Sequence, residues 1–369
     1  MRLMLTIAEL GTGGAESVVI DLAAAAAAAG DEVAVVGARG PLDGRLEGIQ
    51  LTRIPLPAQS GGLSRMPRTV AALRSALREF RPDLIHAHNP RVTTATRIAR
   101  ALAGGPRAPL LATYHGVAPE RSARAARALS GADRIVAVSL PLGAELAADG
   151  VPSRKLSVIR NGATAAAPLA ASVRGELDAE LRLGEGPVVS TVGRLVDQKN
   201  HARFLDAVAL AAPQVPDATF LVVGDGVLRA PLEAKVRELG LGERVRFTGV
   251  RTDARDVIAR SDLLVLSSDW EGFPVVALES LAAGVPLLAT PVAGIEELSS
   301  EGAAETVAAD ERALAAGLVE LLADPARLRE MSNCARDLHA REFSVERMVE
   351  EYRRVYAELV PGAARPSRA

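Results

Sequence analysis

The sequence of 369 residues alternates short apolar segments with longer helical ones, and it does so in two series. In the first series each apolar segment is followed by an alanine- or arginine-rich stretch, and the segments are RLMLTIAE, EVAVVGA, DLIHAHN, PLLATYHG and RIVAVSL. The second series begins after TAAAPLAASVRGEL and comprises PVVSTVGR, ATFLVVGDG, RVRFTGV, DLLVLSS and VPLLAT. Strands that alternate with helices form parallel sheets covered by helices. The sequence therefore predicts an α/β protein with two doubly wound, Rossmann-like domains.

The length also favours two domains, because a single hydrophobic core rarely grows beyond about 250–300 residues. We expect an N-terminal domain over residues 1–165 and a C-terminal domain over residues 180–345. Residues 346–369 should form a helix that packs back on the first domain, followed by a frayed tail, PGAARPSRA. Ligands of such sheets bind beyond the carboxyl ends of the strands. We therefore expect the site in a central cleft between two facing domains.

The composition, 49% hydrophobic and 24% charged, is that of a globular protein. Cys334 is the one cysteine, which excludes an internal disulfide and a cysteine-based metal cage and is compatible with a reducing compartment. The first apolar run ends at Glu9, too early for a signal peptide, and no segment has the length and apolar character to span a membrane. We expect a cytoplasmic protein.

The net charge of −2 is unevenly distributed: residues 1–165 carry 20 basic and 13 acidic side chains, and the rest carry 23 and 32. Thirteen arginines lie between Arg65 and Arg134. They form either a solvated face or a patch that attracts an anionic membrane, such as the inner face of the cell membrane, or another acidic acceptor. Nucleic acid is a less favoured partner, because few aromatic residues are present to stack on bases.

The segment EGFPVVALESLAAGVPLLAT, residues 271–290, carries Glu271 and Glu279 in an apolar context. Pro274 suits the first position of a helix, which places Glu271 before the helix and Glu279 in its second turn, about 10 Å apart along the axis. That spacing suits an elongated ligand with hydroxyls at both ends and a negative middle, such as a nucleotide-diphosphate sugar whose phosphates face the helix start. Alternatively, Glu271 is a charge at the helix start and Glu279 is a paired core carboxylate.

A second motif, VGRLVDQKN, places Arg194 and Lys199 on a loop that leads from a strand to a helix. Two cations there could neutralise a diphosphate leaving group. Lysine is rare in this chain, with Lys155, Lys199 and Lys235 against 40 arginines, so Lys199 serves either a site that needs a compact ammonium group or simply the surface.

A third motif, GTGGAES, follows the first strand and opens a helix. Glu16 stands where the dinucleotide-binding fingerprint has its last glycine, and no clear acidic residue ends the second strand, which disfavours a nicotinamide cofactor. Gly13 and Gly14 still permit close approach of the backbone to a phosphate or a sugar.

Three histidines come next: His86 and His88 share one face of a strand, and His115 ends the following strand in TYHG. No carboxylate accompanies them at the spacing of metal ligands, so we do not expect a metal site. His115 is placed to face the mouth of the cleft.

Together, GGAE, HAHN, YHG, RNG, VGRLVDQKN, VVGDG, FTGVR and EGFPVVALESLAAGVPLLAT resemble the retaining glycosyltransferases of family 4, which have the two-domain GT-B fold. The resemblance runs in order through almost the whole chain. One departure is Thr164 in RNGAT, where many members have an aspartate.

The resemblance implies a role for each matched residue. Glu279 would bind the ribose of the donor, Glu271 and His115 would lie at its sugar, and Arg194 with Lys199 would hold the diphosphate. Gly13 and Gly14 would lie near the phosphates, and the backbone of the segment Gly272, Phe273, Pro274 and Val275 would lie at the phosphate or the sugar. The resemblance further implies retention by front-face attack, with the leaving phosphate accepting the acceptor's proton and with neither an enzyme nucleophile, a metal nor a cofactor required.

The expected function is therefore the transfer of a sugar from a UDP- or GDP-sugar to a glycan, lipid-linked or small-molecule acceptor held by the first domain. Two alternatives from other classes are a nucleotide-sugar epimerase and a non-catalytic partner that only binds the sugar nucleotide.

Overall fold

The computed structural model describes residues 1–56, 66–104 and 107–361. The chain divides into two compact units: the N-terminal unit, Met1–Asn161 with Glu346–Ala369, and the C-terminal unit, Gly162–Val345. Arg65 and the tail from residue 362, which was expected to fray, lie outside the described residues.

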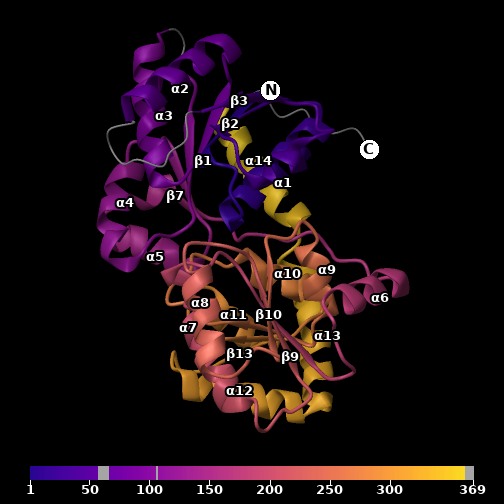
Figure 1. Cartoon of the computed structure of the whole chain (residues 1–369). Coiled ribbons are helices and arrows are strands. Elements are labelled where there is room, and N and C mark those ends of the chain that lie inside the picture. The colour runs from indigo at the N-terminus through magenta and orange to yellow at the C-terminus, as the bar shows by residue number, and fades with distance from the viewer. Residues whose placement is uncertain (57–65, 105–106, 362–369) are drawn as a thin grey trace. The chain divides into compact units, whose positions relative to one another are not determined.

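The N-terminal unit contains a parallel sheet with the strand order β3-β2-β1-β4-β5-β6-β7 in its described part (Figure 1). Its strands are β1 Arg2–Glu9, β2 Glu32–Ala38, β3 Thr52–Pro55, β4 Leu84–His88, β5 Leu110–Tyr114, β6 Arg134–Ala137 and β7 Leu156–Val158. Its helices are α1 Gly14–Ala28, α2 Met66–Phe80, α3 Pro90–Ala103, α4 Ser122–Leu129, α5 Leu140–Ala148 and α14 Val345–Leu359.

The C-terminal unit repeats this plan with the order β10-β9-β8-β11-β12-β13. Its strands are β8 Val188–Val192, β9 Thr219–Val223, β10 Val245–Gly249, β11 Leu263–Leu266, β12 Leu287–Ala289 and β13 Ala304–Thr306. Its helices are α6 Ala171–Glu180, α7 His201–Ala211, α8 Arg229–Glu238, α9 Ala254–Arg260, α10 Val275–Ala283, α11 Ile295–Ser300, α12 Glu311–Ala323 and α13 Pro325–Glu342. The predicted α/β fold with two doubly wound sheets is confirmed.

Each apolar segment of the two series contains a strand, but the sequence analysis missed β3, β7 and β13. These three strands lie at sheet edges. An edge strand has a neighbour on one side only, and it is therefore less buried and less apolar than a central strand. The segments TRIP, LSV and AET contain only one buried residue between them, whereas every residue of β4 and β5 is buried.

Both sheets reverse direction at one pair of strands. In the N-terminal unit the chain builds outward from β1 to β2 and β3, then returns to place β4 on the other side of β1. In the C-terminal unit β8 and β11 form the equivalent pair, with Leu263 opposite Val189. At such a switch point the loops that follow the two strands diverge to opposite faces of the sheet and leave room for a ligand.

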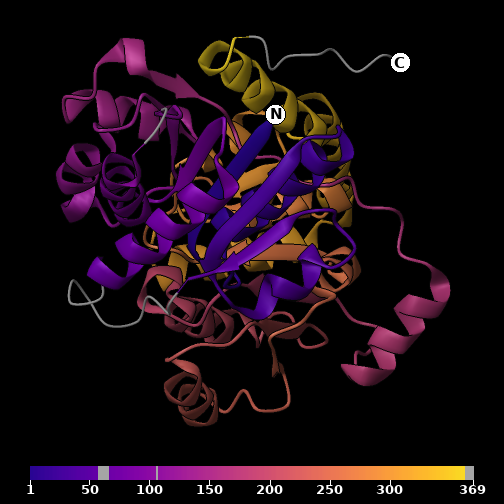
Figure 2. The same ribbon diagram turned by 90° about the horizontal axis from the view of Figure 1, so that it is seen from above.

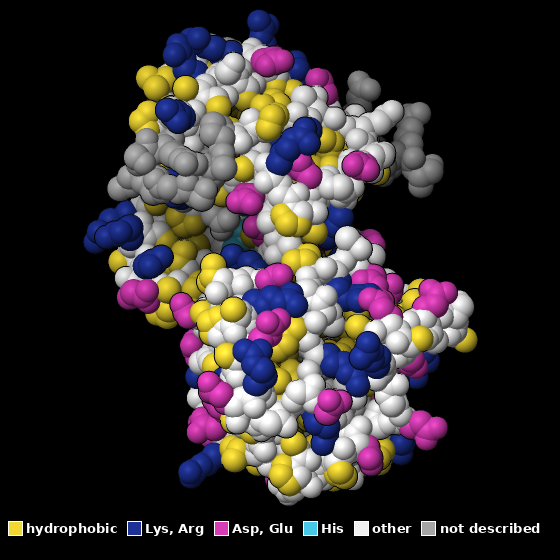
Figure 3. Space-filling model, in the orientation of Figure 1, with side chains coloured by type: hydrophobic (Ala, Val, Ile, Leu, Met, Phe, Trp, Pro, Cys, Tyr) yellow, Lys and Arg dark blue, Asp and Glu magenta, His cyan; other side chains and the backbone are white. Residues whose placement is uncertain are grey.

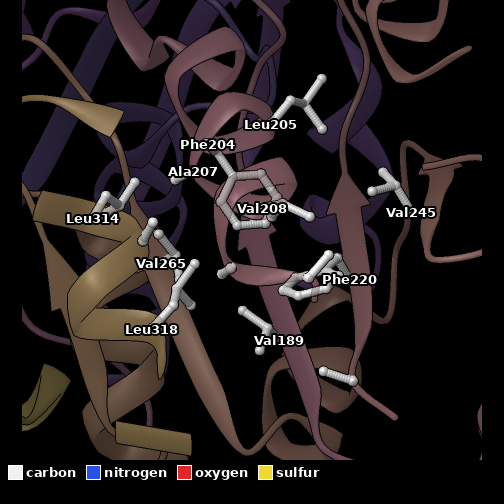
Figure 4. Packing of buried hydrophobic residues seen from close by; sticks show 14 of the residues in the cluster. Val189, Phe204, Leu205, Ala207, Val208, Phe220, Val245, Val265, Leu314 and Leu318 are labelled. Atoms are coloured by element: carbon white, nitrogen blue, oxygen red, sulfur yellow. The ribbon is translucent and has the colours of Figure 1, made fainter. Parts of the chain in front are cut away.

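The core of the C-terminal unit packs α7 and α12 against the sheet (Figure 4). Phe204 of α7 and Phe220 of β9 are fully buried, and their rings meet edge to face at 6.3 Å. Leu314 and Leu318 of α12 complete the same cluster.

The last helix, α14, packs in the N-terminal unit although it ends the described chain, and Figure 2 shows it beside the strands of that sheet. Tyr352 and Tyr356 are buried, and ion pairs join Arg353 to Asp31 at 3.4 Å and Glu358 to Arg134 at 3.1 Å. The helices of the described residues include none with the length and hydropathy of a membrane span.

Replacing Phe204 with Ala should lower the free energy of unfolding of the C-terminal unit by about 3–5 kcal/mol, because it removes a buried ring and leaves a cavity. Trp270, the chain's one tryptophan, lies in this unit, so its fluorescence during urea unfolding measures the change. Leu210→Ala on the same helix is the control: Leu210 is 48% exposed, and a loss within about 0.5 kcal/mol is expected. Equal losses in the two variants would contradict the packing described.

Candidate functional site

The loops after β8 and β11 are bonded to each other at the carboxyl edge of the C-terminal sheet. The backbone N–H of Asp269 donates to the carbonyl of Gln198 at 2.9 Å, and Ser267 Oγ donates to the carbonyl of Lys199 at 3.0 Å. Asn200 has left-handed backbone, φ 43°, and caps α7 by accepting from the N–H of Arg203 at 3.2 Å. Pairing of β8 with β11 thus joins two distant segments into one rigid edge.

Lys199 and Glu271 form an ion pair within this edge. Lys199 lies at the end of a short 3-10 helix, Asp197–Lys199, and its Nζ is 2.5 Å from Oε1 of Glu271. The two side chains are only 15% and 7% exposed. Ser268 Oγ donates to Glu271 at 2.7 Å and Gln198 Nε2 at 3.3 Å. Removing one partner of such a pair leaves an uncompensated charge and costs about 3–5 kcal/mol.

Arg194 lies two residues beyond the end of β8 and is exposed. Its side chain makes no hydrogen bond or ion pair with any residue that the structure describes, in contrast to Lys199. Arg194 is thus a guanidinium that remains available to a ligand at this edge. Such a group binds phosphate oxygens well, because its planar fork matches two of them at once.

Glu279 has a different partner from Glu271. It lies on α10 and accepts a hydrogen bond from Arg255 Nε of α9 at 3.0 Å. The Glu279 side chain is 17% exposed and that of Arg255 is 37% exposed. The sequence analysis found the carboxylate but missed Arg255, because a charged residue on a neighbouring amphipathic helix gives no local signal.

The start of α10 differs from the prediction by one residue. Pro274 is the N-cap, with a ψ of 114° that lies outside the helical region, and the helix begins at Val275. No side chain of the described residues caps this end. The first N–H groups of a helix have no partner within it and carry partial positive charge, so this end favours an anion.

Of the segment that leads into α10, Phe273 offers a ligand only its backbone. Its ring is buried, meets the ring of Phe343 at 5.4 Å and lies so close to Gly294 that a Cβ there would be 1.9 Å from it. Gly272 and Val275 are both buried.

Two glycines of VVGDG that the sequence analysis did not single out are also required by close packing. A Cβ on Gly224, whose φ is +134°, would lie 2.0 Å from the carbonyl oxygen of Gly193. A Cβ on Gly226 would lie 2.4 Å from the carbonyl oxygen of Leu195. The loop after β9 therefore packs directly on the loop that carries Arg194.

In the N-terminal unit, Gly13 and Gly14 lie where β1 leads into α1. Gly13 is the N-cap and Gly14 is the first helical residue. A Cβ on Gly13 would lie 2.4 Å from a carboxylate oxygen of Glu16, so the Glu16 side chain folds back over the helix start. A carboxylate in that place stabilises the helix by its interaction with the dipole.

His86, His88 and His115 form a row in the same unit: His86 and His88 are buried within β4, and half-buried His115 follows β5. His88 Nδ1 is 3.1 Å from His115 Nε2, and the ring centroids of His86 and His88 are 4.1 Å apart. His86 also bonds Tyr356 at 2.8 Å and Thr113 at 2.7 Å. Burial lowers the pKa of His115 to about 3 and holds the pKa values of His86 and His88 well below the usual range. The row is therefore neutral near pH 7.

Neither unit shows a metal centre in its described part, where no group of three or more His, Cys, Asp or Glu side chains converges as ligands would. Asp269, which follows β11, pairs with Arg203 at 2.7 Å and accepts from Asn200 at 3.1 Å.

Comparison with known proteins defines the class of this one. Residues 12–166 match the family described as Glycosyltransferase Family 4, and residues 186–324 match Glycosyl transferases group 1. The protein is a glycosyltransferase. It belongs to the group 1 glycosyltransferases with the GT-B fold, and the two matches together cover most of the chain.

Two curated relatives and one solved structure illustrate the similarity. The chain is 29% identical to the UDP-Gal:alpha-D-GlcNAc-diphosphoundecaprenol alpha-1,3-galactosyltransferase of Escherichia coli, over 69% of this chain and 70% of that protein. It is 30% identical to the lipopolysaccharide core biosynthesis mannosyltransferase LpsB of Rhizobium meliloti, over 50% of this chain and 56% of that protein. Alr3699/HepE of Anabaena, solved in complex with UDP-glucose, has the same fold, with a TM-score of 0.85 at 24% identity over 97% of this chain and 100% of that one.

The histidine row predicts a pH dependence of stability in the N-terminal unit. Below about pH 6.5 the histidines of the unfolded chain bind protons, whereas the neutral imidazoles of the folded row do not. The free energy of unfolding is therefore at its full value above that pH and decreases as the pH falls. With three such histidines, the free energy of unfolding changes by up to about 4 kcal/mol per pH unit. His201, whose pKa burial lowers to about 4, gives the C-terminal unit a shallower slope of about 1.4 kcal/mol per unit.

Urea unfolding between pH 7.5 and pH 5.5 separates the two slopes. All three tyrosines, Tyr114, Tyr352 and Tyr356, lie in the N-terminal unit, and the one tryptophan lies in the other, so tyrosine and tryptophan emission report the units separately. A tyrosine-detected stability that is flat over this range would contradict the neutral, buried row.

Proposed function

We propose that the protein is a retaining glycosyltransferase that uses a UDP-sugar as donor and acts on a lipid-linked or glycan acceptor. The observation that carries this proposal is the charge arrangement at the switch point of the C-terminal sheet. There, exposed Arg194, the Lys199–Glu271 ion pair and the uncapped start of α10 adjoin the ends of β8 and β11. Two cations and a helix N-terminus form a site for a diphosphate, and two carboxylates accept hydroxyl groups.

In this proposal the donor lies along α10. Its diphosphate meets the first N–H groups of the helix, Arg194 and Lys199. Its ribose hydroxyls donate to Glu279, which Arg255 orients. Its sugar hydroxyls donate to Glu271, which also accepts from Ser268 and Lys199. The proposal keeps for His115, Gly13 and Gly14 the roles that the family resemblance implies.

UDP is the favoured nucleotide, because the E. coli relative is named for UDP-Gal and the HepE structure contains UDP-glucose. The sugar is left open by the relatives, whose names include a galactosyltransferase and a mannosyltransferase. GDP-sugars remain the second donor class in the test below.

In the proposed transfer reaction, negative charge develops on the diphosphate as it leaves. An acceptor hydroxyl attacks the anomeric carbon from the face that the diphosphate leaves, the bond from that carbon to the phosphate oxygen breaks, and the phosphate takes the hydroxyl proton. The anomeric configuration is retained without an enzyme nucleophile. Arg194 and Lys199 stabilise the charge that grows on the diphosphate, and cations placed in advance make a large contribution to such a step.

Arg194→Ala should lower kcat for sugar transfer about hundredfold, because a charge-assisted contact to the leaving group is lost. Arg194 is the sharper probe of the two cations, since Lys199→Ala also strips Glu271 of its partner and should destabilise the unit. Arg237→Ala, an exposed arginine of α8, is the matched control and should leave kcat unchanged. Unchanged turnover in Arg194→Ala would remove the assigned role.

The donor class is tested by the melting temperature of the wild type with UDP-, GDP- and ADP-sugars, because a ligand that binds only the folded state raises it. Stabilisation by no nucleotide sugar would contradict the proposal. Stabilisation by GDP-sugars alone would show that the donor nucleotide is GDP and not UDP.

The acceptor side of the proposal rests on an arginine-rich surface of α3 and α4. Arg97, Arg124 and Arg127 are exposed and make no side-chain ion pair with the described residues. Leu102, 54% exposed, lies with Arg97 and Arg107 around a surface hollow of about 480 Å³. Figure 3 shows Lys and Arg side chains over α4 on the face in view. Basic side chains around an apolar one suit a peripheral contact with anionic lipid.

Vesicle flotation should show binding to phosphatidylglycerol vesicles at low salt and its loss at about 0.5 M salt, where charges are screened beyond a few ångströms. The double variant Arg124→Glu and Arg127→Glu should bind several-fold less. Arg237→Glu with Arg312→Glu, two exposed arginines of the other unit, is the control for net charge. Failure of the wild type to float at low salt would exclude the membrane contact.

A further inference from the structure

His88 has no part in the donor contacts proposed above, yet it is fully buried at the end of β4. Its ring lies between two other imidazoles: the centroid of His86 is 4.1 Å away, and that of His115 is 5.4 Å away with the rings inclined by 24°. A polar ring in this position needs its nitrogens accounted for, because a buried polar group without a partner is costly.

The two nitrogens of His88 have different surroundings. Nδ1 is 3.1 Å from Nε2 of His115. Nε2 is buried and has no hydrogen-bond partner among the described residues. A single proton occupies the bond between the two rings, and its position determines the tautomer of both, because each neutral imidazole carries one N–H.

Two arrangements are available. If His115 Nε2 carries the shared proton, His88 must carry its own proton on Nε2, which buries an N–H donor without an acceptor. If His88 Nδ1 carries the shared proton, His88 Nε2 is unprotonated and is an acceptor without a donor. His115 then carries its own proton on Nδ1. Buried donors without acceptors are rarer in proteins than acceptors that lack a donor. The second arrangement is therefore favoured.

Hydrogen bonds hold the neighbouring ring of His86 in place. The ring of His86 is tilted by 35° from that of His88, and it is bonded at one nitrogen to Tyr356 of α14 and at the other to Thr113 of β5. Thr113 in turn is 3.1 Å from the hydroxyl of Tyr352. Because both nitrogens of His86 are engaged, this ring cannot turn to satisfy His88.

We propose that His88 is a positioning residue, which holds His115 as the Nδ1–H tautomer and directs that N–H away from the histidine row as a hydrogen-bond donor. Where His115 contacts the donor sugar, it then donates to a hydroxyl oxygen rather than accepting from the hydroxyl. This consequence rests on the proposed function. The tautomer itself is a property of the N-terminal unit and does not depend on it.

Long-range 15N–1H spectra of the protein labelled with 15N-histidine test the tautomer directly. The chain has five histidines, and the His115 signals are identified by their loss in His115→Ala. The wild type should show His115 protonated at Nδ1. His88→Asn, whose amide N–H takes the place of Nδ1–H, should keep that tautomer, whereas His88→Phe should shift it to a mixture or to Nε2–H.

Tyr356→Phe is the matched control, since it removes a buried hydrogen bond of the same cluster without touching the bond between His88 and His115. It should lower stability and leave the His115 tautomer unchanged. An Nε2–H tautomer in the wild type, or a His115 signal unaltered by His88→Phe, would overturn the proposal. Should His88→Phe fail to fold, His88→Leu removes the same donor, and the wild-type spectrum alone still decides the tautomer.

Steady-state kinetics with the UDP-sugar then measure the consequence. His88→Phe should reduce kcat/KM about tenfold, the loss of one hydrogen bond, and His88→Asn should stay within about threefold of the wild type. Equal loss in the two variants would contradict a positioning role. Absence of transfer by the wild type would instead refute the proposed function and leave the spectroscopic result standing.

Discussion

The parallel pairing of β8 with β11 is the constraint on which the candidate site depends. It places side by side two loops whose charged residues, Lys199 and Glu271, are 72 positions apart in the chain. Neither charge would be stable at its present burial alone, and each is tolerated because the other lies 2.5 Å away. The ion pair, the exposed Arg194 and the start of α10 are thus consequences of strand order. A ligand diphosphate would compete for a lysine that already has a partner.

The N-terminal unit uses the same strand order with different chemistry. Its switch point brings the helix start at Gly13 and Gly14 together with a strand that carries buried histidines. Among the described residues at the carboxyl ends of β1 and β4, no ion pair comparable to Lys199–Glu271 is found. Neutral imidazoles suit hydroxyl groups, whereas paired cations suit phosphates. The two edges therefore differ in the kind of chemical group that each suits. The final helix contributes to this difference, because Tyr352 and Tyr356 reach the histidine row from the other end of the sequence.

Close packing of backbone determines much of the remaining site geometry. Gly224 and Gly226 let the loop after β9 lie against the loop that carries Arg194, and Gly294 leaves room for the ring of Phe273. These contacts fix the backbone around polar groups that must themselves stay accessible. Glycine in such places is a packing requirement, and the pattern VVGDG offers a signal for it only once the neighbouring loop is known.

The sequence by itself determined the fold class and the family, because alternating apolar and helical segments specify central parallel strands and the motifs follow those strands in order. It also marked Glu271, Glu279, Arg194 and Lys199 as residue types that need partners or a ligand. Only the tertiary structure decided the partners: Lys199 for Glu271, Arg255 for Glu279 and His88 for His115. It also decided the edge strands β3, β7 and β13, which are too short and polar to be seen in a pattern. The physical reason is the same in each case, since a partner from another strand or helix leaves no local periodicity.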